Sequence, residues 1–189
     1  MKILIANDDS IHAPGIALLA KVAMEFGEVT VVAPAQQCSA MSQRLTIHGP
    51  IKVEKVEDFP VPVTAAYKVA GTPADCVKVA LHYILEEKPD YVFSGINDGY
   101  NVGYDISYSG TLGAAFEATK NGVPAMAFSS AKNDWLPTAE AHLIPIIREL
   151  LDAGQEPGEV WNVNFPARVP EDVVEILRDR SIAPYSMYQ

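Results

Sequence analysis

The sequence has little positive charge and no long hydrophobic segment. Lysine and arginine number 14 against 24 aspartates and glutamates, which gives a formal charge of -10. A nucleic-acid duplex or an anionic membrane attracts a concentrated basic surface, so neither is expected as the main partner. The N-terminal apolar segment ends at Asp8, and no later apolar run reaches membrane-spanning length. We therefore expect a cytoplasmic protein.

Several common site signatures are also missing. Only Cys38 and Cys76 are present, and their spacing fits neither a zinc site nor a disulfide framework, so we expect reduced thiols. The sequence contains no Gly-Lys-Ser or Gly-Lys-Thr, no dinucleotide fingerprint after the first apolar run and no nucleophile elbow. These absences argue against a P-loop NTPase, a dinucleotide-dependent oxidoreductase and a serine hydrolase.

The chain does have the length and apolar content of one full-sized domain, which we expect to span residues 1–189. Continuous apolar runs typical of buried parallel strands recur along it, at residues 2–6, 29–33, 67–70, 91–94, 125–128 and 160–165. Helical spacing of apolar residues appears between them, at 16–26, 77–85 and 143–151, and Pro145 means that the last helix either begins nearby or is kinked there. This alternation predicts an α/β fold: a three-layer α/β/α, Rossmann-like, doubly wound and mostly parallel sheet.

Three segments do not follow this alternation. Residues 34–44 follow the second strand and are rich in amides and hydroxyls, so they are expected to overhang the carboxyl edge of the sheet. Residues 45–57 have a broken period that fits an antiparallel ribbon or an arm leaving the main sheet. Residues 94–111 form a long segment rich in glycine and asparagine, and a connection of this length inside a compact domain is usually functional or disordered.

Two adjacent carboxylates, Asp8 and Asp9, follow the first strand. Ligands in open α/β sheets bind beyond the carboxyl ends of the strands, so this pair is placed to hold a hard cation or to transfer a proton. The alternative is that Asp9 or Ser10 only caps the next helix. A cap needs one carboxylate, and two side by side repel unless a cation or donors compensate, which favours a site.

The end of the 94–111 segment is typical of an anion site. Ser109, Gly110 and Thr111 precede an apolar helical pattern, and the free amides and dipole of a helix N-terminus favour an anion such as phosphate. The alternative is an ordinary glycine-rich turn with Ser109 as the helix cap. An EF-hand is excluded because the required glycine falls one residue late when Asn97 is the first ligand and no glutamate closes the loop.

Taken together, these motifs resemble the SurE family, the survival-protein E nucleotidases. The resemblance covers residues 1 to about 166 and rests on Asn7-Asp8-Asp9, the Ser39 loop, Gly-Thr-Pro-Ala-Asp-Cys at 71–76, the 94–111 segment and Asn-Val-Asn-Phe-Pro at 162–166. The central segment matches the family pattern Ser-Gly-Ile-Asn-x-Gly-x-Asn-x-Gly-x-Asp-x-x-Tyr-Ser-Gly-Thr in register.

The resemblance implies a divalent-metal-dependent phosphatase that hydrolyses nucleoside 5'-monophosphates, and also 3'-monophosphates and short polyphosphate. It implies that Asp8, Asp9, Ser39 and Asn97 hold one cation per subunit. An all-oxygen set of this kind suits Mg²⁺ or Mn²⁺. Asp8 and Asp9 are then the catalytic residues, and Asn97 joins Ser109, Gly110 and Thr111 in binding the phosphate. Attack by a metal-activated water is our hypothesis, and a route through an aspartyl-phosphate is the alternative.

Three departures from the family pattern bear on this expectation. Ser10 and Ala40 stand where relatives usually have glycine. A side chain at a positive φ would cost about 1 kcal/mol or more at Ser10, and at Ala40 we expect a stiffer or shifted loop. Relatives also continue beyond the segment at 183–188 into a C-terminal tail that helps to form dimers and tetramers, so a homodimer or homotetramer is expected only if this chain assembles without that tail. A metal-dependent nucleotide-binding or regulatory module with impaired catalysis, and an inactive scaffold, are therefore kept as alternatives.

Overall fold

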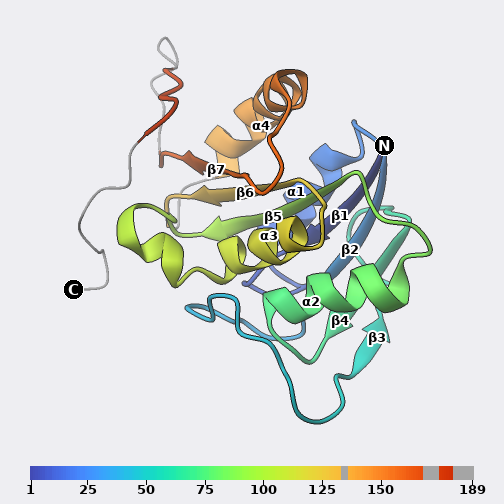
Figure 1. The fold of residues 1–189 in the computed structure, drawn as a ribbon. Coiled ribbons are helices and arrows are strands. Elements are labelled where there is room, and N and C mark those ends of the chain that lie inside the picture. The colour runs from blue at the N-terminus through green and yellow to red at the C-terminus, as the bar shows by residue number, and fades with distance from the viewer. Residues whose placement is uncertain (133–135, 168–174, 181–189) are drawn as a thin grey trace.

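The computed structural model describes residues 1–132, 136–167 and 175–180. Its centre is a seven-stranded sheet in the order β3-β4-β2-β1-β5-β6-β7, in which only β3 is antiparallel to its neighbour (Figure 1). The strands are β1 Lys2–Ala6, β2 Glu28–Pro34, β3 Val53–Lys55, β4 Ala65–Val69, β5 Tyr91–Asp98, β6 Ala125–Ser130 and β7 Val160–Phe165. The predicted parallel sheet is confirmed.

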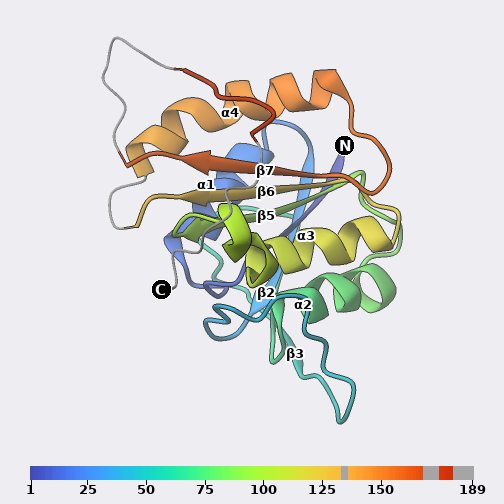
Figure 2. The same cartoon turned by 60° about the vertical axis from the view of Figure 1, so that its left-hand side comes forward.

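Helices cover both faces of the sheet, as Figure 2 shows. One layer contains α1 (Pro14–Ala23) and α4 (Leu136–Ala153), and the other contains α2 (Pro73–Val79) and α3 (Gly110–Lys120). A π-helical turn, Ala80–Ile84, extends α2, and a 3₁₀ helix, Gly103–Ser107, precedes α3. The predicted three-layer α/β/α architecture is confirmed.

The alternation of side chains along β1 explains the two layers. Ile3 and Ile5 pack into the apolar cluster under α1 and α4, whereas Leu4 and Ala6 pack into the cluster under α2 and α3. Because a strand directs successive side chains to opposite faces, a strand covered on both sides needs apolar residues at every position. The continuous apolar run at the N-terminus is therefore the central strand of the sheet.

The strand order also fixes where a ligand would bind. From β1 the chain continues through β2 to β4 on one side, whereas β5, β6 and β7 follow one another on the other side of β1. The order therefore reverses between β1 and β5, and open α/β sheets bind their ligands outside the carboxyl ends of the strands at such a switch point. The candidate residues at the ends of β1 and β5 lie at this point.

Three details differ from or sharpen the sequence-based expectations. β5 continues past residue 94 to Asp98, and it pairs again with β6 after a shift in register. Within the 45–57 segment, Val53–Lys55 forms β3, which pairs antiparallel with β4 as the edge strand of the sheet, so the antiparallel alternative holds for this part. α4 begins at Leu136 and contains Pro145, so that helix does not begin at the proline.

The segment at 183–188, after which the family tail was expected to begin, lies outside the described residues. Within the part of the chain that is described, no helix has the length and apolarity needed to cross a membrane.

Candidate metal and phosphate site

Asp8 lies just beyond β1, and its side chain is buried. Its Oδ1 accepts a hydrogen bond from the Thr111 hydroxyl at 2.6 Å. Its backbone carbonyl accepts one from the Cys38 amide at 2.7 Å. Asp8 thereby joins the end of β1, the loop after β2 and the first turn of α3, which are distant in sequence.

Asp9 is half-buried and receives donors from two other segments. Its Oδ2 accepts the Asp98 amide at 2.9 Å, and its Oδ1 accepts the Gln37 side-chain amide at 3.1 Å. The alternative that Asp9 or Ser10 caps the first helix is wrong, because the N-cap of α1 is Ala13 and no side chain caps it. Asp9 is held toward the end of β5 instead.

Asn97 is the next-to-last residue of β5 and is half-buried. Its side-chain Nδ2 donates to the Gly99 carbonyl at 2.7 Å. This bond uses the nitrogen of the amide, so Oδ1 remains the atom of Asn97 with which it would bind a cation. Asp98, whose backbone amide binds Asp9, is its immediate neighbour, so Asn97 lies beside the acid pair.

Ser39 is exposed on the loop that follows β2. The loop is tied to Asp8 through Cys38, and further along the Ser42 amide donates to the Tyr108 carbonyl at 2.9 Å. A Cβ added at Gly113 would lie only 1.9 Å from the Ser42 carbonyl oxygen, so glycine is required there. The loop that carries Ser39 therefore lies against the beginning of α3.

The beginning of α3 faces Asp8. Ser109 is the N-cap, and its Oγ accepts the Leu112 amide at 3.1 Å, so the capping role is observed. A Cβ added at Gly110 would lie 2.9 Å from the Asp8 Cβ, which shows how closely the helix approaches the carboxylate. Binding of a phosphate by Ser109, Gly110 and Thr111 stays a prediction.

The electrostatics of Asp8 are unusual for a carboxylate. Burial, opposed by the hydrogen bond from Thr111 and assisted by the charge of Asp9, raises the pKa of its carboxyl group to about 7. Among the described residues, no lysine or arginine forms an ion pair with Asp8 or Asp9. A buried carboxylate without a cationic partner is compensated when a metal ion binds it.

The four predicted metal ligands are thus brought to three neighbouring strands, since β2, β1 and β5 are adjacent in the sheet. In the described ranges no three His, Cys, Asp or Glu side chains form a metal-binding group. The predicted ligand set does not require such a group of three, because besides Asp8 and Asp9 it consists of the hydroxyl of Ser39 and the amide oxygen of Asn97. The convergence of the four side-chain oxygens on one cation stays a prediction.

Sequence reasoning missed the partners that hold the acid pair. Gln37 and Asp98 bind Asp9 across separations of 28 and 89 residues. The residue types gave one signal, because Gln37 lies in the polar loop that was expected to overhang the carboxyl edge and Asp98 lies in the segment that follows the 91–94 apolar run. Which donor meets which acceptor depends on the strand order.

The two departures from the family glycines have the backbone conformation that glycine favours. Ser10 has φ of 94° and Ala40 has φ of 56°. The turn at Ser10 is supported by Asn7, whose side-chain Nδ2 donates to the Ser10 carbonyl at 2.8 Å. The chain therefore forms both turns without glycine, at a cost of about 1 kcal/mol or more for each.

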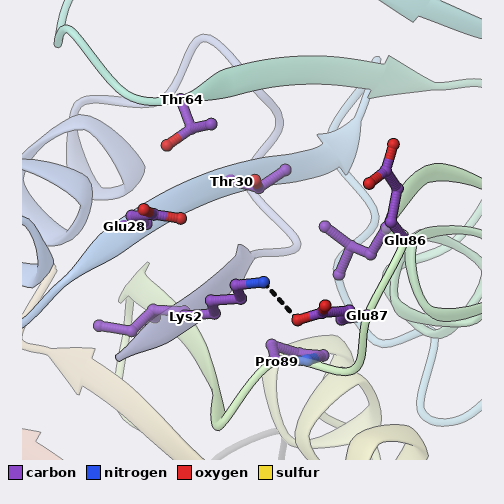
Figure 3. Close-up of a pocket in the computed structure, with 9 residues that line it drawn as sticks. Lys2, Glu28, Thr30, Thr64, Glu86, Glu87 and Pro89 are labelled. Carbon is purple, nitrogen blue, oxygen red and sulfur yellow. Dashed lines mark hydrogen bonds and ion pairs between the residues drawn. The ribbon is translucent and has the colours of Figure 1, made fainter.

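A separate pocket lies at the opposite, amino edge of the sheet (Figure 3). It is lined by the starts of β1 and β2 and by the segment that precedes β5, with an ion pair between Lys2 and Glu87 across it. The strands separate this pocket from the acid pair, so it is no part of the candidate site.

Comparison with known proteins gives one consistent result. The family model "Survival protein SurE" matches residues 3–183. The 5'-nucleotidase SurE of Geobacter sulfurreducens is 43% identical over 176 residues, covering 92% of this chain and 65% of that protein. The 5'-nucleotidase SurE of Neisseria gonorrhoeae is 43% identical over 175 residues, covering 92% of this chain and 68% of that protein.

The fold comparison agrees with the sequence comparison. The crystal structure of the SurE protein from Aquifex aeolicus matches with a TM-score of 0.78 and 38% identity, over 89% of this chain and 67% of that one. This chain spans about two thirds of the length of the relatives that it matches. The family model, the identities to these relatives and the matching fold together show that the chain belongs to the SurE family.

Proposed function

We propose that this chain is a phosphatase that hydrolyses nucleoside 5'-monophosphates with the help of one divalent cation. The observation that carries the proposal is the hydrogen bond between Thr111 and Asp8, because it sets the N-terminus of α3 beside the acid pair. The names of the relatives, 5'-nucleotidase SurE, support the substrate class. The oligomeric state stays a prediction.

The donor set supports a hard cation. Asp8, Asp9, Ser39 and Asn97 offer carboxylate, hydroxyl and amide oxygens, which Mg²⁺ and Mn²⁺ prefer and zinc does not. The buried, uncompensated Asp8 supports the same conclusion. When bound, such a cation supplies Lewis-acid polarisation of a phosphoryl oxygen and lowers the pKa of water.

The chain itself supplies the orientation of the phosphate. The first amides of α3 have no partners within the helix, and together with the helix dipole they offset the negative charge of a phosphate group. The Thr111 hydroxyl donates to Asp8, which fixes the carboxylate relative to those amides. Gln37 and the Asp98 amide hold both oxygens of Asp9 in place.

We assign the nucleophile to water rather than to Asp8. The Oδ1 atom of Asp8 already accepts the hydrogen bond from Thr111. Gly110 packs so closely against Asp8 that a Cβ added at Gly110 would lie 3.1 Å from the Oδ2 atom of Asp8. The carboxylate therefore has little freedom to move toward phosphorus. Trapping an acid-stable, hydroxylamine-labile phosphoenzyme would show the aspartyl-phosphate route instead.

The test is phosphate release from adenosine and guanosine 5'-monophosphate by the purified protein with Mn²⁺ or Mg²⁺, and again with a chelator. We expect release only with the cation. Asp9→Asn should lower kcat/KM by about 100-fold or more, because a carboxylate that orients the reacting groups is lost.

Asp90→Asn is the matched control. Asp90 also accepts a backbone amide, that of Lys2, but at the amino edge of the sheet. This variant should keep its activity. Nucleotide binding without phosphate release by the unaltered protein would overturn the phosphatase proposal and favour a binding module.

A further inference from the structure

Beyond the acid pair, the carboxyl edge of the sheet contains a second polar cluster, centred on Asn101. Asn101 is 5% exposed and lies on the loop between β5 and the 3₁₀ helix. Its backbone amide donates to Asn164 Oδ1 at 2.9 Å, and its backbone carbonyl accepts Asn162 Nδ2 at 2.8 Å. Its side-chain Nδ2 donates to Ser129 Oγ at 2.7 Å.

The two partners on β7 also bind each other. Asn164 Nδ2 donates to Asn162 Oδ1 at 3.2 Å and to the Asn101 carbonyl at 3.3 Å. The cluster needs groups that donate and accept at the same time, and the side-chain amide of asparagine does both. Aspartate has the same shape but cannot donate when it is ionised.

The position of the cluster connects it to both halves of the candidate site. Asn97, Ser129 and Asn164 are paired across β5, β6 and β7. Downstream of Asn101, the chain passes through the 3₁₀ helix Gly103–Ser107 directly into Ser109 and Thr111. The loop is therefore fixed at a point between a predicted metal ligand and the predicted phosphate-binding turn.

We propose that Asn162 and Asn164 are positioning residues for the phosphatase reaction, acting through Asn101 on the loop that sets Asn97 and the start of α3. The inference rests on the proposed function. The hydrogen bonds of Asn162 and Asn164 go to Asn101, whereas Asp8 and Asp9 bind Thr111 and the Asp98 amide, so the effect of the two asparagines passes through the loop. Displacement of reacting groups by about 1 Å can reduce a rate by about 100-fold.

The decisive variant is Asn162→Asp. It keeps the shape of the side chain but replaces the donor to the Asn101 carbonyl with a carboxylate that repels it. We expect kcat/KM for adenosine 5'-monophosphate to fall by about tenfold or more. We also expect the inhibition constant of inorganic phosphate to rise, since the start of α3 is no longer held.

Gln155→Glu is the matched control. Its Nε2 donates to the backbone carbonyls of Ala125 at 2.9 Å and Glu159 at 3.0 Å, at the amino ends of the same region of the sheet. The change from amide to carboxylate is identical, but it lies at the edge away from the site. This variant should lose a similar amount of thermal stability and keep its kcat/KM.

Hydrogen exchange provides a readout that does not need activity. The backbone amides of residues 101–112 should exchange faster in Asn162→Asp than in Gln155→Glu, while those of β1 should not change. Equal kcat/KM in the two variants, or unchanged exchange over 101–112, would overturn the positioning role. If the unaltered protein releases no phosphate, the proposed function fails, and the exchange result then still reports separately on whether the cluster holds the loop.

Discussion

At the scale of single residues, Ser10 carries the clearest strain. Its φ of 94° lies outside the regions that a side chain readily adopts, and it directly follows the acid pair. The bonds around it are local, from Asn7 to its carbonyl and from the His12 amide to its hydroxyl at a loose 3.4 Å. These contacts hold the turn but do not remove the steric cost of the side chain.

Ser10→Gly should therefore stabilise the protein by about 1 kcal/mol, reduced somewhat by the greater freedom of glycine in the unfolded chain. Ser107→Gly is the control, because Ser107 lies in the 3₁₀ helix without a positive φ and should lose stability when it becomes glycine. Urea unfolding of both variants measures the two free energies. A Ser10→Gly variant less stable than the unaltered protein would show that the turn is not strained.

The sequence was informative about residues whose role depends on their neighbours in the chain. Asp8 and Asp9 end an apolar run, and that pattern alone placed them at the rim of a buried strand. The role of Asn162 and Asn164 was not predictable in this way, because their partner Asn101 is 61 and 63 residues away. Such pairs are set by the strand order and by a bulge in β5 that no local pattern marks.

At the scale of elements, predicted boundaries were wrong where polar residues continue a strand. Asn97 and Asp98 pair with Ser129 and Ser130, so β5 extends by backbone hydrogen bonds beyond its apolar part. The helical pattern at 77–85 was confirmed in place, but its second half is a π-helical turn, Ala80–Ile84. Apolar spacing reports which face is buried and not which backbone hydrogen bonds form.

The first turn of α2 both caps the helix and connects it to a neighbouring segment. Asp75 forms a capping box with Thr72 and also accepts the amide and the hydroxyl of Thr46 at 2.9 and 2.7 Å. It thereby ties the segment that follows the Ser39 loop to α2.

Asp75→Asn should destabilise the protein by about 2 kcal/mol, because a new donor faces groups that also donate. Asp152→Asn, at an exposed position in α4, should change the stability by less than about 0.5 kcal/mol. The two free energies of unfolding can be compared directly by denaturant titration. Similar values for both variants would mean that the Thr46 and Thr72 contacts are not formed in solution.

At the scale of the whole molecule, the pKa of Asp8 links stability to pH. The folded protein without metal holds a proton on Asp8 up to about pH 7, whereas the unfolded chain releases it near the ordinary value of 3.8. Between these values the folded state binds more protons than the unfolded state, so the stability contributed by this group falls as the pH rises.

The metal-free protein should therefore lose up to about 4 kcal/mol from this group between pH 4 and pH 7. Asp8→Asn removes the titration, so the pH slopes of the two proteins in chelator should differ over that range. Adding Mn²⁺ should stabilise the unaltered protein increasingly as the pH rises, since the cation binds the ionised carboxylate. Parallel stability curves for the two proteins in chelator would contradict the raised pKa.

The contact between Gly113 and Ser42 sets a practical limit on redesign. Any side chain at position 113 would occupy the space of that carbonyl oxygen, so mutant libraries aimed at new substrates should leave this glycine unchanged. Tyr104 and Tyr108 are 56% and 54% exposed near the same helix start. Substitution of their side chains should leave the contact between the Ser39 loop and the beginning of α3 in place.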